Sequence, residues 1–353
     1  KSLKYCESLK LDGLVVIGGD DSNTNAALLA EYFVKNGSSV RVVGCPKTID
    51  GDLKNEFVEV SFGFDTACKT YSECIGSVMV DTLSSQKYYH FIRLMGRSAS
   101  HIALECALLT RPTYTFIGEE VHANGSTLKQ LVEELVGIIV ERSKAGKNYG
   151  VILVPEGLIE FIREMNVLIQ EINTVMAKTE IDKKLDGEDL FKLVHSRLTG
   201  NSQQLLSFLP KNISEQLLLD RDPHGNVQVA KIETEKLIID LVIEQLRSNP
   251  DYKGEFSPQS NYFGYEGRCA FPTNFDCDYC YSLGVNAGAI IETGHTGLMS
   301  CIRNLNNEPE EWLAGGYPLI TMMDLEVRKG KNVPVITKAL VDLNGPLFGL
   351  FKS

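Results

Sequence analysis

Residues 14–29 read LVVIGGDDSNTNAALL, and this stretch decides the fold class that the sequence predicts. A short apolar run ends at Gly18 and Gly19, two aspartates follow, and Ser22 can cap a helix that begins at Asn23. The glycines let the backbone approach an anion, and the helix N-terminus offers N–H groups without an intrahelical partner. Strand, turn and helix in this order predict an α/β domain with a phosphate site. A ligand-free turn in which an aspartate caps the helix is the alternative.

Asp20 and Asp21, the two aspartates of this turn, also indicate a metal ion. A carboxylate next to a phosphate repels it unless a cation lies between them, and Mg²⁺ binds carboxylate and phosphate oxygens together. We therefore predict Mg²⁺ at this turn.

The alternation of strand and helix continues outward from the turn. Short β-rich apolar runs alternate with longer stretches of helical periodicity, a pattern typical of parallel strands joined by crossover helices. The predicted strands are residues 14–17, 40–44, 89–94, 114–118 and 150–154. The predicted helices are residues 23–34, 65–83, 99–109 and 128–144. Residues 1–157 are therefore predicted to form one α/β domain.

The pattern changes after Gly157. Residues 158–250 are rich in helix-forming residues with leucine and isoleucine periodicity and show few strand signals, which predicts a mainly helical insertion. Beyond Tyr252 glycine and aromatic residues return, so residues 251–353 are predicted to form the remainder of a second α/β domain.

Length and composition limit the classes of function. With 353 residues, 43% of them hydrophobic and 23% charged, the chain is typical of a globular protein of about two domains. A net charge of −11 argues against nucleic acid and against anionic lipid as partners. No apolar run is long enough to span a membrane, and the first residues lack the features of a secretory signal, so the expected compartment is the cytoplasm.

A second cluster of candidate residues follows the next predicted strand, in the sequence GCPKTIDGDL of residues 44–53. Lys47 offers a cation, and Asp50 and Asp52 are separated by one glycine. In phosphoryl transfer to a hydroxyl, a carboxylate can accept the proton of the nucleophile while cations neutralise the phosphates. Asp50 is the candidate base, and the alternative is an Asp-Gly-Asp loop that only turns the chain.

Two further strand ends carry candidate ligands. Met95, Gly96 and Arg97 separate a predicted strand from a helix, and Glu156 follows another strand. Both positions are carboxyl ends of strands, where open α/β sheets bind ligands. Arg97 could bind phosphate through its guanidinium fork, and Glu156 could accept hydrogen bonds from sugar hydroxyls. The alternative for Arg97 is a solvated side chain without a ligand. The alternative for Glu156 is a negative charge that stabilises a helix N-terminus.

The sequence NYFGYEGRCAFPTNFD of residues 261–276 holds the last cluster. Tyr265, Glu266 and Arg268 lie among glycines there and offer a hydroxyl, a carboxylate and a guanidinium within four residues. This mixture suits a sugar phosphate, whereas a structural loop lined by aromatic residues would leave the arginine without a role.

In this order, the segments resemble the pyrophosphate-dependent phosphofructokinases, in particular the long form related to the plant catalytic subunit. The matching strings are GGDDSNTNAA, CPKTIDGDLKN, GFDTACK, YYHFIRLMGRSASHIALECAL, PEGLI, and GYEGRC followed by FPTNFD. The resemblance covers most of the chain and implies two Rossmann-like three-layer α/β domains of the phosphofructokinase type with a helical insertion. Family members also carry a Gly-rich loop, GGxxPGxN, on an earlier strand. Residues before Asp12 do not supply it, so an N-terminal part of the fold is expected to be missing from this sequence.

The resemblance implies transfer of a phosphoryl group from pyrophosphate to the 1-hydroxyl of fructose 6-phosphate, which gives fructose 1,6-bisphosphate and phosphate. Asp20 would hold Mg²⁺, and Gly18, Gly19 and Lys47 would bind pyrophosphate. Asp21 and Lys47 replace smaller residues of ATP-using relatives, which indicates pyrophosphate as the donor.

The resemblance also implies the residues of the reaction centre. The implied catalytic residues are Asp50, Asp52, Arg97, Lys47 and Asp21, with Asp50 as the proton acceptor. The implied substrate-binding residues are Thr48, Ile49, Asp50, Lys87, Tyr88, Met95, Gly96, Arg97, Glu156, Tyr265, Glu266, Gly267 and Arg268. Lys87 and Tyr88 match positions that contribute to a neighbouring subunit's site, which implies a homo-oligomer, expected to be a dimer.

Two other functions stay open. An ATP-dependent phosphofructokinase is one, and Asp21 with Lys47 argues against it. A non-catalytic regulatory subunit of the same enzyme is the other, and the retention of Asp50, Asp52 and Arg97 argues against that. A lipid or NAD kinase would share the GGD turn but none of the later segments.

Overall fold

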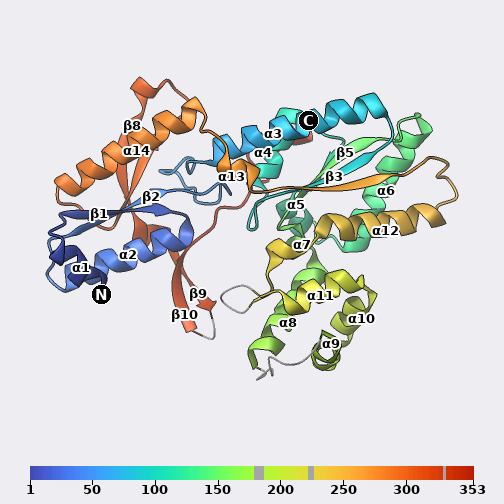
Figure 1. Ribbon diagram of the computed structural model, residues 1–353, viewed down its shortest axis with the longest axis horizontal. Helices are drawn as coiled ribbons and strands as arrows, with labels where there is room; N and C mark the ends of the chain where they lie inside the picture. The colour runs from blue at the N-terminus through green and yellow to red at the C-terminus, as the bar shows by residue number, and fades with distance from the viewer. Residues whose placement is uncertain (179–186, 222–225, 329–330) are drawn as a thin grey trace. The chain divides into compact units, whose positions relative to one another are not determined.

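The computed structural model describes residues 1–178, 187–221, 226–328 and 331–353, and the chain divides into two compact units (Figure 1). Unit 1 comprises residues 1–69 and 267–340. Unit 2 comprises residues 70–266 and 341–353. Each unit contains a four-stranded sheet with helices packed against it.

The sheet of unit 1 is mainly parallel. Its strands in spatial order are β1 (Gly13–Gly18), β2 (Arg41–Pro46), β7 (Leu298–Arg303) and β8 (Leu313–Pro318). The first three are parallel, and β8 returns antiparallel to β7. The helices are α1 (Ser2–Ser8), α2 (Asp20–Lys35) and α14 (Asn274–Glu292), with 3₁₀ turns η2 (Pro309–Glu311) and η3 (Leu319–Met322). An antiparallel hairpin of β9 (Met323–Arg328) and β10 (Lys331–Ile336) follows.

Side-chain alternation along β2 gives unit 1 three layers. Val42 is buried in a core with Ala30 and Phe33 of α2, whereas Val43 is buried with Ala287 of α14. Successive side chains of a strand point to opposite faces of the sheet. The helices α2 and α14 therefore cover opposite faces, and Figure 1 shows the strands between them.

The named strands of the sheet in unit 2 are all parallel. In spatial order they are β4 (Tyr114–Thr115), β5 (Gly150–Pro155), β3 (Tyr89–Leu94) and β6 (Pro258–Phe263). The first helices are α3 (Phe64–Ser85), which begins in unit 1, α4 (His101–Thr110), α5 (Gly118–Ala123) and α6 (Leu128–Lys144). The later elements are α7 (Leu158–Phe161), α8 (Arg163–Lys178), α9 (Gly187–His195), α10 (Gly200–Phe208), α11 (Lys211–Leu219), η1 (Val229–Lys231), α12 (Thr234–Ser248) and α15 (Pro346–Lys352). The short α13 (Glu266–Cys269) lies where the chain passes back to unit 1.

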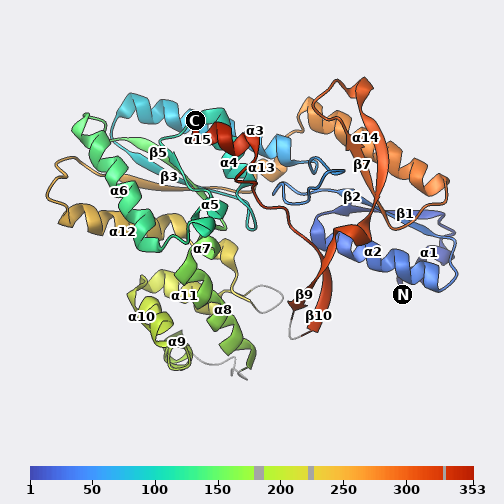
Figure 2. The same cartoon turned by 180° about the vertical axis from the view of Figure 1, so that it is seen from behind.

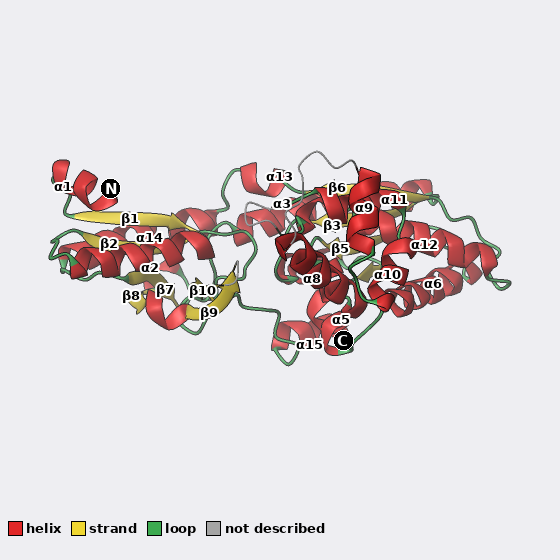
Figure 3. Cartoon of the chain, turned by 90° about the horizontal axis from the view of Figure 1, so that it is seen from below, coloured by secondary structure: helices red, strands yellow, loops and turns green. Residues whose placement is uncertain are grey.

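The helical segment shares the main core of unit 2. Leu168 of α8 and Leu190 of α9 belong to the same buried cluster as Phe91 of β3 and Ile152 of β5. Figure 3 shows α8 to α12 gathered on this unit. Elsewhere in unit 2, α4 contacts β4 and β5, and α15 packs against α4 near the C-terminus (Figure 2).

The structure confirms the predicted α/β class with parallel sheets and corrects several details. The strand predicted at 114–118 is shorter, because Gly118 already begins α5. The helix predicted to begin at Asn23 begins at Asp20, so Gly19 and not Ser22 is the N-cap residue.

The domain boundaries also differ from those predicted. The segment 1–157, predicted as one domain, supplies strands to both sheets, and the contacts divide the chain after Lys69, within α3. Strand β6 was not predicted, because its sequence PQSNYF begins with proline and is mostly polar. None of the helices in the described ranges is both long and apolar enough to cross a bilayer.

Candidate active site

The two acidic segments of unit 1 meet at the carboxyl ends of β1 and β2. These strands pair in parallel, with Gly18 opposite Pro46, and the N–H of Lys47 donates to the Gly18 carbonyl at 2.8 Å. A β-carbon on Gly19 would lie 3.6 Å from the Lys47 carbonyl oxygen. The glycine turn and the loop that begins at Lys47 are therefore neighbours, as parallel pairing requires.

Asn23 fixes these two strand ends. Its side chain is fully buried, and its Nδ2 donates to the carbonyl oxygens of Gly18, Gly19 and Cys45 at 2.7, 3.0 and 3.3 Å. A β-carbon on Gly44 would lie 2.1 Å from Asn23 Oδ1, so a larger residue there would displace the Asn23 side chain. Sequence reasoning missed this role of Asn23, although an asparagine one turn into a helix after a glycine turn is a detectable signal.

Three carboxylates and one lysine interact at this edge. Burial, then the negative charge of Asp50, raises the pKa of Asp52 from 3.8 to about 6, while Lys338 opposes this shift and Asp20 adds to it. The Nζ of Lys338 lies 3.8 Å from Asp20 Oδ2. Gly51, between the two loop aspartates, has a φ of 71°, which glycine adopts without strain. The sequence offered no signal for Lys338, which is more than 280 residues from its partners Asp20 and Asp52.

A cavity of about 280 Å³ opens beside this loop in unit 1. The predicted residues that line it are Lys47, Thr48, Ile49, Gly267 and Arg268. The N–H of Asp50 donates to Thr48 Oγ1 at 3.1 Å, and Ser61 Oγ donates to the Thr48 carbonyl at 2.9 Å, which holds the loop in shape.

Asp276 forms part of the cavity wall and was not predicted as a site residue. Its buried carboxylate accepts hydrogen bonds from the N–H groups of Gly63 and Thr66, each at 3.0 Å, and from the Thr66 hydroxyl. It therefore satisfies backbone groups at the N-terminus of α3, next to the loop. Thr273 Oγ1 in turn accepts a hydrogen bond from the Asp276 N–H.

In unit 2 the predicted ligands lie at the carboxyl ends of β3 and β5. The N–H of Gly96 donates to Glu156 Oε2 at 3.1 Å, and the N–H of Gly157 donates to the Gly96 carbonyl at 3.2 Å. Gly96 has a φ of 130°, a conformation that other residues rarely adopt. Glu156 is 2% exposed, whereas Arg97 is exposed. The structure thus joins Gly96 and Glu156 directly.

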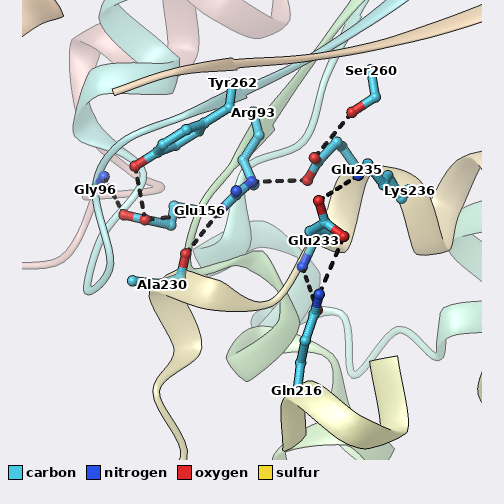
Figure 4. Close-up of polar contacts among 10 residues, drawn as sticks. All are labelled: Arg93, Gly96, Glu156, Gln216, Ala230, Glu233, Glu235, Lys236, Ser260 and Tyr262. Atoms are coloured by element: carbon cyan, nitrogen blue, oxygen red, sulfur yellow. Dashed lines mark hydrogen bonds and ion pairs between the residues drawn. The ribbon is translucent and has the colours of Figure 1, made fainter. Parts of the chain in front are cut away.

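Arg93, in the last part of β3, is a buried charge that sequence reasoning did not single out (Figure 4). Its guanidinium lies 4.1 Å from the ring centre of Tyr262, and Tyr262 Oη donates to Glu156 Oε1 at 3.2 Å. Burial raises the pKa of Tyr262 above its usual value, so its hydroxyl is a donor at neutral pH. The signal was one charged residue in the apolar strand YHFIRL.

Other predicted residues lie elsewhere. Lys87 and Tyr88 precede β3, so one strand length, roughly 20 Å, separates them from Gly96 at its other end. Glu266 Oε2 accepts a hydrogen bond from the Gly264 N–H at 2.7 Å, within its own loop, and Tyr265 is 66% exposed. The predicted residues in unit 1 are Gly18, Gly19, Asp20, Asp21, Lys47, Thr48, Ile49, Asp50, Asp52, Gly267 and Arg268, and the others are in unit 2.

The residues at the edge of unit 1 fit a metal ion that is held jointly with a phosphate. Within the described part of the chain, no group of three or more His, Cys, Asp and Glu residues is arranged to hold a metal. Mg²⁺ is usually bound by one or two carboxylates together with phosphate oxygens. Asp20, in the first turn of α2, can supply one such carboxylate.

Known proteins resemble this chain over nearly its whole length. A family model described as Phosphofructokinase matches residues 1–204. Pyrophosphate--fructose 6-phosphate 1-phosphotransferase subunit beta 1 of Arabidopsis thaliana is 56% identical over 350 residues, 98% of this chain and 61% of that protein. The Treponema pallidum protein named Pyrophosphate--fructose 6-phosphate 1-phosphotransferase is 54% identical over 348 residues, 97% of this chain and 61% of that protein. The chain thus spans about three fifths of these relatives' length.

A solved structure shares the fold at low sequence identity. The crystal structure of a pyrophosphate-dependent phosphofructokinase from Nitrosospira multiformis matches with a TM-score of 0.59 and 15% identity, over 97% of this chain and 64% of that one. Since the family model covers 204 of the 353 residues, the chain belongs to the phosphofructokinase family.

Proposed function

We propose that the protein containing this chain transfers a phosphoryl group from pyrophosphate to the 1-hydroxyl of fructose 6-phosphate. The observation that carries the proposal is the cluster of Asp20, Asp50 and Asp52 beside Lys47 at the ends of β1 and β2. Phosphoryl transfer requires acidic, cationic and glycine-rich groups at one place, since positioning and charge neutralisation dominate its catalysis. The names of the relatives with 54 and 56% identity support the same reaction.

Unit 1 would bind the donor. The N-terminus of α2 and the glycines before it offer backbone N–H groups to a phosphate, and Lys47 adds a positive charge. Asp21, in the first turn of α2, would occupy space that a larger nucleotide donor needs. These residues support pyrophosphate rather than ATP as the donor.

Asp50 would act as the general base that accepts the proton of the 1-hydroxyl. Asp52, two residues away and buried, has a raised pKa of about 6 and increases the negative charge around the base. Arg97, at the end of β3 in unit 2, would stabilise the charge of the transferred phosphoryl group. Glu156 and Gly96 would orient the sugar, together with Arg268 and Tyr265.

Enzymes of the phosphofructokinase family generally use a divalent metal, and we propose Mg²⁺ for this one. When bound, Mg²⁺ would neutralise phosphate charge in the transition state. Asp20 is the residue that would hold it. A protein with a net charge of −11 needs such local positive charge to bind an anion.

Lys87 and Tyr88 support a homo-oligomer, with a dimer as the simplest form. They lie at the amino end of β3, away from Gly96, so in this proposal they serve the site of a second copy. The cytoplasm is the proposed compartment.

The test is formation of fructose 1,6-bisphosphate by the full-length protein from fructose 6-phosphate and Mg²⁺, with pyrophosphate or ATP as donor. Product with pyrophosphate alone is the expected result. Product with ATP alone would overturn the interpretation of Asp21 and Lys47. The absence of product with either donor would favour a regulatory subunit.

A further inference from the structure

Arg93 in unit 2 lies on the same face of the sheet as the predicted sugar-binding carboxylate (Figure 4). In the strand register, Arg93 of β3 is opposite Val154 of β5 and Tyr262 of β6. Glu156 follows Val154 by two residues, and side chains two residues apart point to the same face. The alternation therefore directs Arg93, Tyr262 and Glu156 toward one another.

The guanidinium of Arg93 contacts both the site and the helical segment. Its Nη1 donates to the carbonyl of Ala230 in η1 at 2.9 Å and lies 3.8 Å from Glu156 Oε1. Its Nε lies 2.8 Å from Oε2 of Glu235 in α12. Its plane also contacts the ring of Tyr262, at 4.1 Å from the ring centre. One side chain therefore connects two helical elements to the ends of β5 and β6.

Both oxygens of Glu156 are oriented by residues of this group. Tyr262 Oη donates to Oε1, and the N–H of Gly96 donates to Oε2. Gly96 belongs to the predicted sugar-phosphate segment, and its carbonyl also accepts the N–H of Gly157. A shift of Glu156 would therefore displace the Gly96 backbone as well.

The electrostatics of the group depend on the arginine. Arg93, Glu156 and Glu235 are 6, 2 and 2% exposed, so one guanidinium compensates two buried carboxyl groups. Burial raises the pKa of Glu235, and Arg93 with a hydrogen bond from Ser260 opposes that shift. A lysine carries a single ammonium group instead of a planar guanidinium. It could therefore not contact Ala230, Glu156 and Glu235 at the same time.

We propose that Arg93 is a positioning residue for the sugar phosphate: held by Ala230 and Glu235 of the helical segment, it fixes Glu156, and through it Gly96, in the orientation that binds substrate. The inference rests on the proposed function, since it assumes that Glu156 and Gly96 bind the sugar. It gives the helical segment a role in substrate affinity.

The decisive variant removes the ion pair of Arg93 with Glu235, and the remaining buried carboxyl group, Glu156, keeps its hydrogen bonds from Tyr262 and Gly96. Arg93→Met alone would leave two carboxyl groups uncompensated and destabilise the fold, whereas Arg93→Met with Glu235→Met replaces the pair by apolar side chains, a change that is often neutral for stability. In the full-length protein, we expect this double variant to raise KM for fructose 6-phosphate about tenfold or more, with KM for pyrophosphate nearly unchanged. Hydrogen exchange of the peptide segment 94–98 should become faster, because Gly96 loses its fixed acceptor.

Two further variants separate positioning from stability. Arg142→Met removes another arginine of unit 2, one that donates to the Tyr149 carbonyl at 2.7 Å near the opposite end of β5. It should lower the melting temperature and leave KM for fructose 6-phosphate unchanged. Arg93→Lys should raise KM for fructose 6-phosphate as much as the double variant does, because a lysine keeps the positive charge but lacks the several donors of the guanidinium.

The outcomes distinguish this inference from the proposed function. A double variant with wild-type KM for fructose 6-phosphate, in an active enzyme, would overturn the role of Arg93 and leave the proposed function intact. An equal rise of KM for fructose 6-phosphate in Arg142→Met would also overturn the role of Arg93. No transfer by the wild-type protein would overturn the proposed function, and this inference with it.

Discussion

Gly157 lies against the backbone of Arg97, so close that a β-carbon at position 157 would be 2.1 Å from the Arg97 carbonyl oxygen. The obstacle is backbone, and a side-chain rotation cannot relieve it. Gly157→Ala must therefore displace the segment that carries Gly96 and Arg97. We expect kcat/KM for fructose 6-phosphate to fall about 100-fold, measured by steady-state kinetics, since small displacements of positioning groups have such effects.

Gly137 provides the matched control for this substitution. It lies within α6, and a β-carbon there would meet nothing within 4 Å. Gly137→Ala should stabilise the helix by up to about 1 kcal/mol and leave the kinetics unchanged. Equal kinetic effects of the two substitutions would show that the close contact of Gly157 with Arg97 is irrelevant to activity.

The raised pKa of Asp52 predicts that the free energy of unfolding decreases as the pH rises. Its pKa is about 6 in the folded state against an ordinary value of 3.8, so between these values the folded state binds more protons than the unfolded state. The free energy of unfolding therefore falls from about pH 4 to pH 6. Asp52→Asn should raise it at pH 7 by up to about 3 kcal/mol and have little effect at pH 3, below both pKa values.

Urea unfolding of both proteins at pH 3 and pH 7, without Mg²⁺ or phosphate ligands, measures this difference. A stabilisation of the same size at both pH values would exclude titration of Asp52 as its cause. Turnover should fall in the same variant, since the proposed reaction uses this carboxylate.

Asp276 is expected to be a structural residue of the cavity in unit 1. Asp276→Ala leaves the N–H groups of Gly63 and Thr66 without their acceptor and should lower stability by about 3 kcal/mol. Asp278→Ala, at an exposed position two residues later in the same helix, is the control and should be nearly neutral. Thermal unfolding followed by circular dichroism compares the two, and equal melting temperatures would contradict the role of Asp276.

Asp50→Ala tests the proposed base. Loss of a general base should lower kcat by a factor of about 100 to 10,000 while fructose 6-phosphate still binds, because the base acts in the transition state. Turnover assays and isothermal titration with fructose 6-phosphate measure the two quantities separately. Turnover at the wild-type rate would remove Asp50 from the mechanism.

Replacing Asp21 and Lys47 together by glycine tests the choice of donor. If these side chains exclude ATP by their size and charge, the double variant should gain measurable transfer from ATP and lose affinity for pyrophosphate. Assays with each donor in turn give both results. A variant that loses pyrophosphate without gaining ATP would show that other pocket residues select the donor.

Local patterns in the sequence predicted the elements of the fold better than their assembly. The strand at 89–94 and the helix at 128–144 have the predicted bounds, because strand and helix periodicity and the helix cap are encoded within each segment. Two α/β domains were predicted, but the assignment of the chain's segments to the two sheets was not. It depends on pairing of β2 with β7, about 250 residues later, which no local pattern reports.

The same limit applies to the candidate site. Polar residues after the strands could be identified from the sequence, because strand ends and glycine turns mark them. Most of the groups that hold these residues in place could not be identified; Asn23 and Arg93 are exceptions, because an asparagine after a glycine turn and a charge within an apolar strand are local signals. Asp276 and Lys338 act on residues more than 200 positions away. The assigned roles in the reaction stay predictions.

The route of the chain through the two units has a consequence for its synthesis on the ribosome. Residues 13–46 form the first two strands of the sheet of unit 1, and β7 and β8 are added only when residues 267–340 have been synthesised. Until then the N–H of Val42 lacks its acceptor, the hydroxyl of Thr296. Unit 2 in turn receives residues 341–353 only after the last segment of unit 1 has been synthesised. Residues 70–266 of unit 2 must therefore leave the ribosome before either unit is complete. Contacts between segments so far apart in the sequence give a high contact order, which slows refolding. Chaperone dependence during translation should exceed that of a protein whose domains are continuous in sequence.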